Sequence, residues 1–328
     1  MPIDRRAWCR ESGGREHDDT GASGSMMLSK GNEIARNFFE FGEKASLDMR
    51  LKDDTLFAKV VVDEDGLAKI ARKPLPDKRY LIFFTPRSGS SRLGDLIDKT
   101  GYLRDPGEPF NPAFVPTMAQ KFDAPDIETY VSNLMRLRNT NNVFGAEATF
   151  RQIQCVFGSM EEMLRLVQPT SCIWLIREDL VAQAVSLSRH KQTRVGHSPA
   201  VDLAAQARAE EVFVYKPDDI IKALRMLFWQ EARIEECLVR YGLDALRLSY
   251  ETTTRAREQD VVALICGHIG VEIPDLSVAH SPHTKLRGTK GRAFAERFRN
   301  EHPDLLARID ERRAERISKL HVIASGPS

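Results

Sequence analysis

Short apolar runs alternate with longer segments in which apolar residues recur every three or four positions. Four runs predict buried strands: RYLIFF (79–84), VFGAEA (143–148), SCIWLI (171–176) and ALRLSY (245–250). Helical spacing follows in residues 92–102, 127–138, 152–166, 179–191, 220–240 and 256–268. Strands that alternate with helices form parallel βαβ units. The pattern therefore predicts an α/β protein, in which a three-layer parallel sheet carries helices on both faces.

The part of the chain before the first strand has a different character. Residues 1 to about 30 are polar and rich in Gly, Ser, Asp and Arg, which predicts a disordered tail. Residues 31–78 form a small extension, in which Leu56 to Arg72 has two apolar stretches around Asp-Glu-Asp-Gly. This arrangement favours a β-hairpin with Gly66 at a positive φ. The main domain then covers residues 79–320.

The composition changes this picture only by excluding partners. A formal net charge of +1 gives no overall field that would attract nucleic acid or an anionic membrane. Five scattered cysteines without a CxxC pair indicate reduced thiols. No apolar run is long enough to cross a bilayer. We expect a cytoplasmic protein, and a homo-oligomer is compatible with the sequence.

Candidate chemistry begins at the loop Thr85-Pro-Arg-Ser-Gly-Ser-Ser, which joins the first strand to a helix. Ligands of open parallel sheets bind at this edge. Gly89 permits a tight turn, and the backbone amides from Gly89 to Arg92 can point at one anion. Hydroxyl donors come from Ser88, Ser90 and Ser91, and Arg87 adds a charged fork. The alternative is an ordinary serine-capped helix after a turn.

The loop differs from that of a kinase or an ATPase. Those loops read GxxxxGK[ST], but no such lysine follows Gly89. The strand at 171–176 is followed by Arg177, where an NTPase usually has an aspartate for Mg²⁺. The pattern therefore favours a nucleotide that is bound without a metal ion.

The helix after Arg177 carries a polar stripe. Asp179, Gln183, Ser186 and His190 follow one another at intervals of four, three and four residues. Apolar residues occupy the other side and are expected to face the sheet: Leu180, Val181, Ala184, Val185 and Leu187.

Two blocks of this sequence resemble a known family. The strand and PRSGS loop are similar to the 5′-phosphosulfate loop of sulfotransferases that use 3′-phosphoadenosine 5′-phosphosulfate (PAPS). The block WLIREDLVAQAVSLSRHKQT resembles the bacterial carbohydrate branch, which contains trehalose 2-sulfotransferases and the rhizobial Nod-factor and lipopolysaccharide sulfotransferases. The likeness runs from about Tyr80 to Arg299, with 80–112 and 171–193 its specific blocks. It implies a P-loop-like nucleotide-binding sulfotransferase fold, PAPS as donor, no metal, and a carbohydrate or glycolipid acceptor.

The resemblance also implies roles for individual residues. Arg177 and Ser186 would hold the 3′-phosphate, and Arg87 would act in catalysis. The loop residues that would bind the 5′-phosphosulfate are Arg87, Ser88, Gly89, Ser90 and Ser91. In GEPFNP (107–112), Glu108 would be the general base. The segment 285–294, which is basic and contains two glycines, loosely resembles a loop that covers the 3′-phosphate.

Two positions depart from the family pattern, and two alternatives stay open. Pro109 replaces an aromatic residue, and Glu147 stands where many relatives carry lysine. A small-molecule kinase of the P-loop type is opposed by the absent lysine. A non-catalytic protein that binds a nucleotide through the same loops is compatible with both departures.

Overall fold

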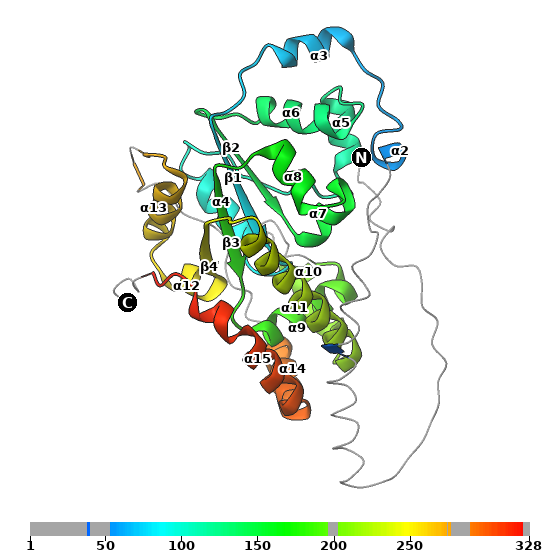
Figure 1. Ribbon diagram of the computed structural model, residues 1–328. Helices are drawn as coiled ribbons and strands as arrows, with labels where there is room; N and C mark the ends of the chain where they lie inside the picture. The colour runs from blue at the N-terminus through cyan, green and yellow to red at the C-terminus, as the bar shows by residue number, and fades with distance from the viewer. Residues whose placement is uncertain (1–37, 40–52, 196–202, 274, 277–288, 324–328) are drawn as a thin grey trace.

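The computed structural model describes residues 38–39, 53–195, 203–273, 275–276 and 289–323. Its centre is a four-stranded sheet with the order β2-β1-β3-β4, and all neighbouring strands are parallel (Figure 1). The strands are β1 (Lys78–Phe84), β2 (Val143–Ala148), β3 (Ser171–Ile176) and β4 (Ala245–Ser249). The four predicted strands and the predicted α/β class are confirmed.

Alternation along β1 divides the core between the two faces of the sheet. Leu81 and Phe83 pack on one face, with α5 (Val115–Lys121), α6 (Ile127–Leu137), α7 (Phe150–Phe157) and α8 (Met160–Val167). Tyr80, Ile82 and Phe84 pack on the other face, with α4 (Ser90–Asp98) and α13 (Glu258–Ile269). Because successive side chains of a strand point to opposite faces, a continuous apolar run buries both. The predicted three layers are confirmed.

The segment 152–166, predicted as one helix, is two helices. Gly158 ends α7 with a φ of 78°, a left-handed conformation that glycine adopts readily. Ser159 then caps α8, and its hydroxyl accepts a hydrogen bond from the amide of Glu162 at 3.1 Å. Gly-Ser at this point was therefore a helix boundary that the apolar spacing did not reveal.

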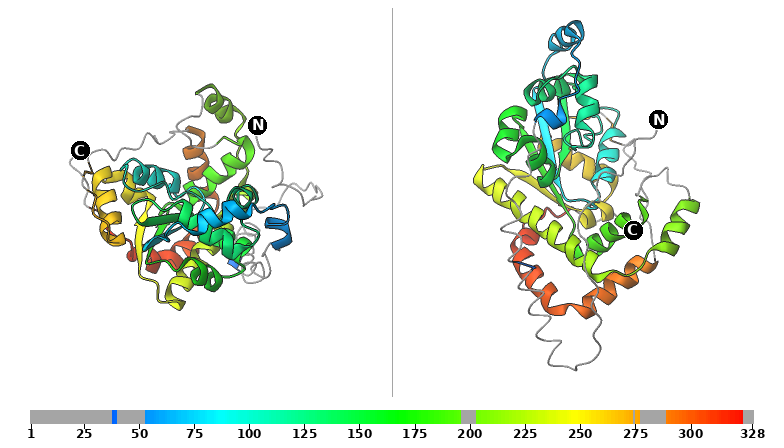
Figure 2. Two further views of the ribbon diagram at one scale, coloured as in Figure 1. Left: turned by 90° about the horizontal axis from the view of Figure 1, so that it is seen from above. Right: turned by 90° about the vertical axis from the view of Figure 1, so that its right-hand side faces the viewer.

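The predicted hairpin at Leu56–Arg72 is wrong. This part of the chain forms the end of α2 (Asp53–Leu56) and then α3 (Glu64–Ala71), with Gly66 inside the helix. The side chain of Asp63 caps α3 by accepting a hydrogen bond from the amide of Asp65. Acidic residues in the first helical turn favour the helix through its dipole. Helix α3 lies at one end of the molecule, and α14 and α15 lie at the other (Figure 2, right).

A third core lies beyond the carboxyl ends of the strands. It is built from α9 (Leu180–Thr193), α11 (Pro217–Arg240), α14 (Thr289–Glu301) and α15 (Pro303–Ser318), with Phe213, which directly follows α10 (Leu203–Val212) (Figure 1). Leu180, Val181, Ala184 and Val185 of α9 pack in this core. The prediction that they face the sheet is wrong, because α9 begins after β3 has ended and its apolar partners are other helices.

Two earlier predictions lie outside the described residues: the disordered tail at 1–30 and the first part of the basic segment at 285–288. The remainder of that segment begins helix α14. The division of the chain into tail, extension and main domain stays a prediction. Within the described ranges, no helix combines the length and apolar character needed to cross a membrane.

Candidate active site

The loop between β1 and α4 forms a turn at the carboxyl edge of the sheet. Gly89 is the N-cap residue of α4 and has a φ of 91°. A Cβ atom at Gly89 would lie 2.6 Å from Cδ2 of Tyr250, so both the conformation and the space require glycine. The amides of Gly89, Ser90 and Ser91 lie at the start of the helix, where they have no acceptor within the helix. The loop therefore presents backbone donors beside the ring of Tyr250.

The three serines of the loop have different surroundings. Ser88 is fully buried, and its hydroxyl has no hydrogen-bond partner among the residues that the structure describes. Ser90 is buried, and its hydroxyl opposes the rise in the pKa of the Glu147 carboxyl group. Ser91 is exposed. A buried hydroxyl group without a hydrogen-bond partner costs free energy. A bound anion would remove this cost by accepting a hydrogen bond from Ser88.

Gln183 fastens this loop to helix α9. Its Nε2 atom donates to Oγ1 of Thr85 at 2.9 Å and to the carbonyl oxygen of Pro86 at 2.8 Å. Gln183 and Thr85 are both fully buried. The sequence placed Gln183 on a polar stripe with Ser186, and the structure adds that Gln183 positions the loop.

Three arginines converge where the loop meets α9. The Nε atom of Arg87 donates to Oγ of Ser186 at 3.2 Å, so the loop and the predicted 3′-phosphate residues form one site. Burial, followed by the charges of Arg177 and Arg189, lowers the pKa of the Arg87 guanidinium to about 10. Cations that lie this close repel one another in a partly buried site. The cluster of Arg87, Arg177 and Arg189 is therefore arranged to receive an anion.

Sequence reasoning did not identify Arg189. Its only signal was its spacing, three residues after Ser186, which places both side chains on one side of a helix. Oε2 of Glu210 lies 3.6 Å from the Nε atom of Arg189.

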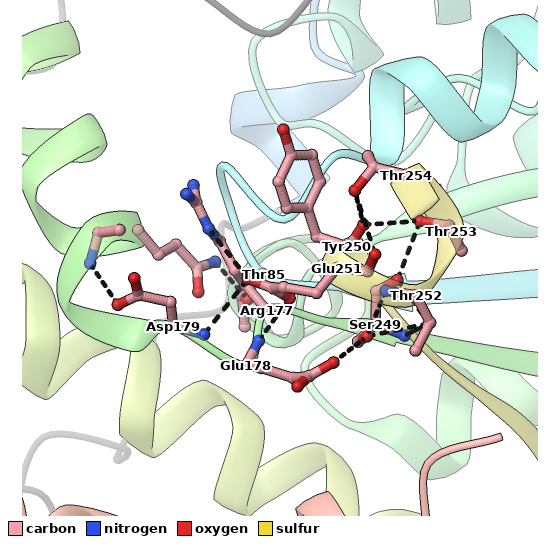
Figure 3. A network of polar contacts seen from close by, with 12 residues as sticks. Thr85, Arg177, Glu178, Asp179, Ser249, Tyr250, Glu251, Thr252, Thr253 and Thr254 are labelled. Carbon is pink, nitrogen blue, oxygen red and sulfur yellow. Dashed lines mark hydrogen bonds and ion pairs between the residues drawn. The ribbon is translucent and has the colours of Figure 1, made fainter. Parts of the chain in front are cut away.

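The pair Tyr250-Glu251, at the start of α12 (Tyr250–Arg255), supports Arg177 (Figure 3). The guanidinium of Arg177 lies 4.9 Å from the centre of the Tyr250 ring. The carboxylate of Glu251 accepts hydrogen bonds from the amides of Glu178 (2.9 Å) and Asp179 (3.4 Å), and it lies 3.7 Å from Nε of Arg177. No chemical role could be predicted for this pair, because its partners are more than 70 residues away along the chain.

Glu108 lies in a loop that is anchored next to the end of β2. Its Oε2 atom accepts hydrogen bonds from Nε2 of Gln152 at 2.6 Å and from Nδ2 of Asn111 at 3.2 Å. The carbonyl oxygen of Gly107 accepts from the amide of Glu147 at 2.7 Å. The hydroxyl of Tyr130 donates to the carbonyl oxygen of Pro109 at 2.7 Å. The backbone around Pro109 is thus held in place although the aromatic residue is absent.

Glu147 stands between the loop and Glu108. Its side chain lies on the face covered by α4, is 3% exposed, and has an Oε1 atom without a hydrogen-bond partner in the described structure. Burial, followed by the charges of Glu108 and Asp105, raises the pKa of Glu147 to about 8. A neutral carboxyl group at this position avoids placing a third negative charge beside Glu108 and Asp105.

We expect Glu147→Gln to stabilise the protein increasingly as pH rises. The folded chain holds the Glu147 proton more tightly than the unfolded chain, whose carboxyl keeps its ordinary pKa of 4.5. Wild type therefore loses stability relative to the glutamine variant as pH rises from 4.5 through about 8. The slope is at most about 1.4 kcal/mol per pH unit. Urea unfolding at several pH values measures it, with exposed Glu161→Gln as control. A pH-independent difference would contradict the assignment.

Where metal ligands are concerned, the described ranges contain no group of three or more His, Cys, Asp or Glu side chains arranged to hold an ion.

The parallel sheet, the glycine turn into α4 and the converging arginines define an α/β protein whose basic and backbone N–H groups gather at the carboxyl edge of its sheet, where ligands of open parallel sheets bind. Residues 79–301 match the model of the Stf0 sulphotransferase family. The match covers more than half of the chain, so the chain belongs to this family and is a sulfotransferase. The resemblance that was drawn from the PRSGS and WLIRED blocks is confirmed.

Among solved structures, the sulfotransferase from Alicyclobacillus acidocaldarius is similar, with a sequence identity of 14% and a TM-score of 0.40. The similarity covers 71% of this chain and 94% of that chain. No curated protein matches this sequence.

Proposed function

We propose that this sulfotransferase moves a sulfuryl group from PAPS to a hydroxyl group of a carbohydrate or glycolipid. The observation that carries the donor assignment is the cluster of Arg87, Arg177 and Arg189 around Ser186, beside the start of α4. PAPS has phosphate groups at both ends of its ribose, and the cluster and the loop offer two adjoining sets of donors. The acceptor class rests on the resemblance of residues 171–193 to the bacterial carbohydrate sulfotransferases.

The residues of the site fit such a donor. Buried polar atoms without a hydrogen-bond partner among the described residues include Oγ of Ser88 and the Nε atoms of Arg177 and Arg189. Carboxylates lie near both arginines, but at 3.7 Å and 3.6 Å, beyond hydrogen-bond distance. Each unsatisfied donor costs free energy, and a phosphate oxygen would satisfy it with a charge-assisted bond.

On the donor side, the residues of this chain would bind and orient PAPS. Arg177 and Ser186, with Arg189 beside them, would hold the 3′-phosphate. Ser88 and the amides at Gly89, Ser90 and Ser91 would hold the 5′-phosphosulfate. Arg87 belongs to both groups, since its backbone lies in the loop and its side chain contacts Ser186. Its charge would stabilise the phosphate oxygen that is left when the bond to sulfur breaks.

On the acceptor side, Glu108 would remove the proton from the attacking hydroxyl group. Gln152 and Asn111 both donate to Oε2, so we assign the proton transfer to Oε1. The new bond joins the acceptor oxygen to sulfur, the bond between sulfur and the phosphate oxygen breaks, and the electron pair stays on the phosphate. The transfer is in line, so the acceptor must lie opposite the departing phosphate.

The donor assignment predicts selective stabilisation by 3′-phosphoadenosine 5′-phosphate (PAP). At a concentration about 100 times its dissociation constant, PAP should raise the free energy of unfolding by roughly 2.7 kcal/mol. AMP and ATP at the same concentration should do much less, because neither has a 3′-phosphate. EDTA should leave the effect of PAP unchanged. Thermal unfolding with each nucleotide is the measurement, and equal effects of ATP, or a need for Mg²⁺, would refute the assignment.

The acceptor is tested separately. The protein is incubated with ³⁵S-labelled PAPS and a cell extract, and the labelled product is identified by mass spectrometry. A labelled sugar or glycolipid supports the acceptor class, and label in another hydroxyl compound overturns it. PAP binding without transfer to any acceptor would favour a non-catalytic role.

A further inference from the structure

Helix α15 (Pro303–Ser318) follows the residues that the family model matches, yet it reaches the donor site. Leu305 and Ile309 fix the helix in the third core, together with residues of α9 and α11. One turn further along α15, Arg313 is also buried, with its side chain 2% exposed. A buried arginine at this point calls for an explanation, because burial of an unpaired charge is costly.

The guanidinium of Arg313 is satisfied on every side. Its Nε and Nη2 atoms donate to the two carboxylate oxygens of Glu231, at 2.8 Å and 3.0 Å. Nη2 also donates to the carbonyl oxygen of Arg177 at 2.7 Å, and Nη1 donates to that of Glu178 at 2.9 Å. The side chain of Glu231, on α11, is fully buried. The ion pair with Glu231 thus holds the N–H groups of the Arg313 guanidinium against the backbone at the end of β3.

The turn that carries Arg177 is therefore held from two directions. The carboxylate of Glu251 accepts hydrogen bonds from the amides of Glu178 and Asp179. The guanidinium of Arg313 donates hydrogen bonds to the carbonyl oxygens of Arg177 and Glu178. These contacts leave the guanidinium of Arg177 directed toward the Tyr250 ring. Hydrophobic residues could replace a buried ion pair without loss of stability, but they could not make these backbone contacts.

We propose that Arg313 is a positioning residue that sets the discrimination between nucleotides with and without a 3′-phosphate. The proposal rests on the proposed function, in which Arg177 binds that phosphate. Arg313 acts by fixing the backbone of Arg177 and does not touch the ligand. The C-terminal helix is then a working part of the donor site.

The test compares Arg313→Lys with Arg316→Lys. Lysine keeps a positive charge for Glu231 but lacks the fork that reaches both carbonyls. Arg316 is the matched control, since it also lies on α15 and its Nη1 atom is 3.6 Å from the same Glu231 carboxylate. Calorimetry measures the dissociation constants of PAP and of adenosine 5′-phosphosulfate for each variant. The dissociation constant of PAP, divided by that of adenosine 5′-phosphosulfate, should rise about tenfold in Arg313→Lys and should stay at the wild-type value in Arg316→Lys.

If Arg313 had only a structural role, Arg313→Lys would lower the melting temperature and weaken the binding of both nucleotides in parallel. An unchanged ratio of the dissociation constants therefore overturns the proposal. If Arg313→Lys does not fold, the pair is replaced together, as Glu231→Gln with Arg313→Met, which removes both buried charges. The dissociation constant of PAP, divided by that of adenosine 5′-phosphosulfate, should rise in that variant too, and a wild-type ratio refutes the role. Wild type that binds PAP no better than adenosine 5′-phosphosulfate refutes the proposed function itself, and the inference with it.

Discussion

Glu108→Gln should lower turnover by about 10²–10⁴-fold and leave the melting temperature and the affinity for PAP near the wild-type values. Glutamine keeps the shape of the side chain, and its carbonyl oxygen can still accept the hydrogen bonds from Gln152 and Asn111. It cannot accept the proton of the acceptor hydroxyl. Once the acceptor is known, single-turnover transfer with saturating PAPS measures the loss.

The matched control is Glu128→Gln. Glu128 lies on α6, is largely exposed, and forms an ion pair with Arg165 away from the site. This variant should transfer sulfate at the wild-type rate. If Glu108→Gln transfers within a few-fold of wild type, Glu108 is not the base. A large loss of melting temperature in Glu108→Gln would instead point to a structural role for this carboxylate.

The second large effect is expected from Arg177→Ala, which should weaken PAP by about 10- to 150-fold and adenosine 5′-phosphosulfate much less. The substitution removes a charge-assisted contact that only a 3′-phosphate can make. Arg87→Ala should weaken both ligands, because the backbone of Arg87 lies in the loop and its side chain reaches Ser186. Calorimetric titration of both nucleotides into each variant provides the four affinities.

Arg165→Ala controls for the loss of an arginine in general, since Arg165 is half exposed and pairs with Glu128 and Glu162 away from the loop. Its affinities should equal those of wild type. Parallel losses of both nucleotides in Arg177→Ala and Arg87→Ala would mean that the two arginines serve one phosphate group, and the division of roles would be wrong.

The strands were predictable because β1, β2 and β3 are short, largely apolar runs that are buried on both faces, and β4 alternates buried leucines with partly exposed residues. The errors arose where the local sequence pattern does not determine which structure forms or which element packs against it. The valines at 60–62 suggested a strand, but the Asp63 cap favoured a helix after them. The apolar side of α9 was read correctly as buried, yet nothing in its spacing distinguishes a sheet from a layer of helices.

In the site, the sequence suggested candidates only where they lie within a contiguous, recognisable block. Arg87, Arg177 and Ser186 were named from two blocks, and the structure brings them together. Glu251 and Arg313 were not assigned roles, because they form hydrogen bonds with the backbone of residues that are 72 to 136 positions away in the sequence. A carboxylate or guanidinium that binds main-chain groups leaves no motif in the sequence.

Helix α11 has a consequence for how the protein unfolds. Its 24 residues place Leu224 and Leu227 in the core of the helical layer and Ile234 and Leu238 in the core beneath the sheet. Neither core can come apart without exposing half of the same helix. The sheet and the helical layer should therefore melt as one cooperative unit, although the chain has enough residues for two. The proposed donor site lies along the junction of the two cores, so it should persist intact until that single transition.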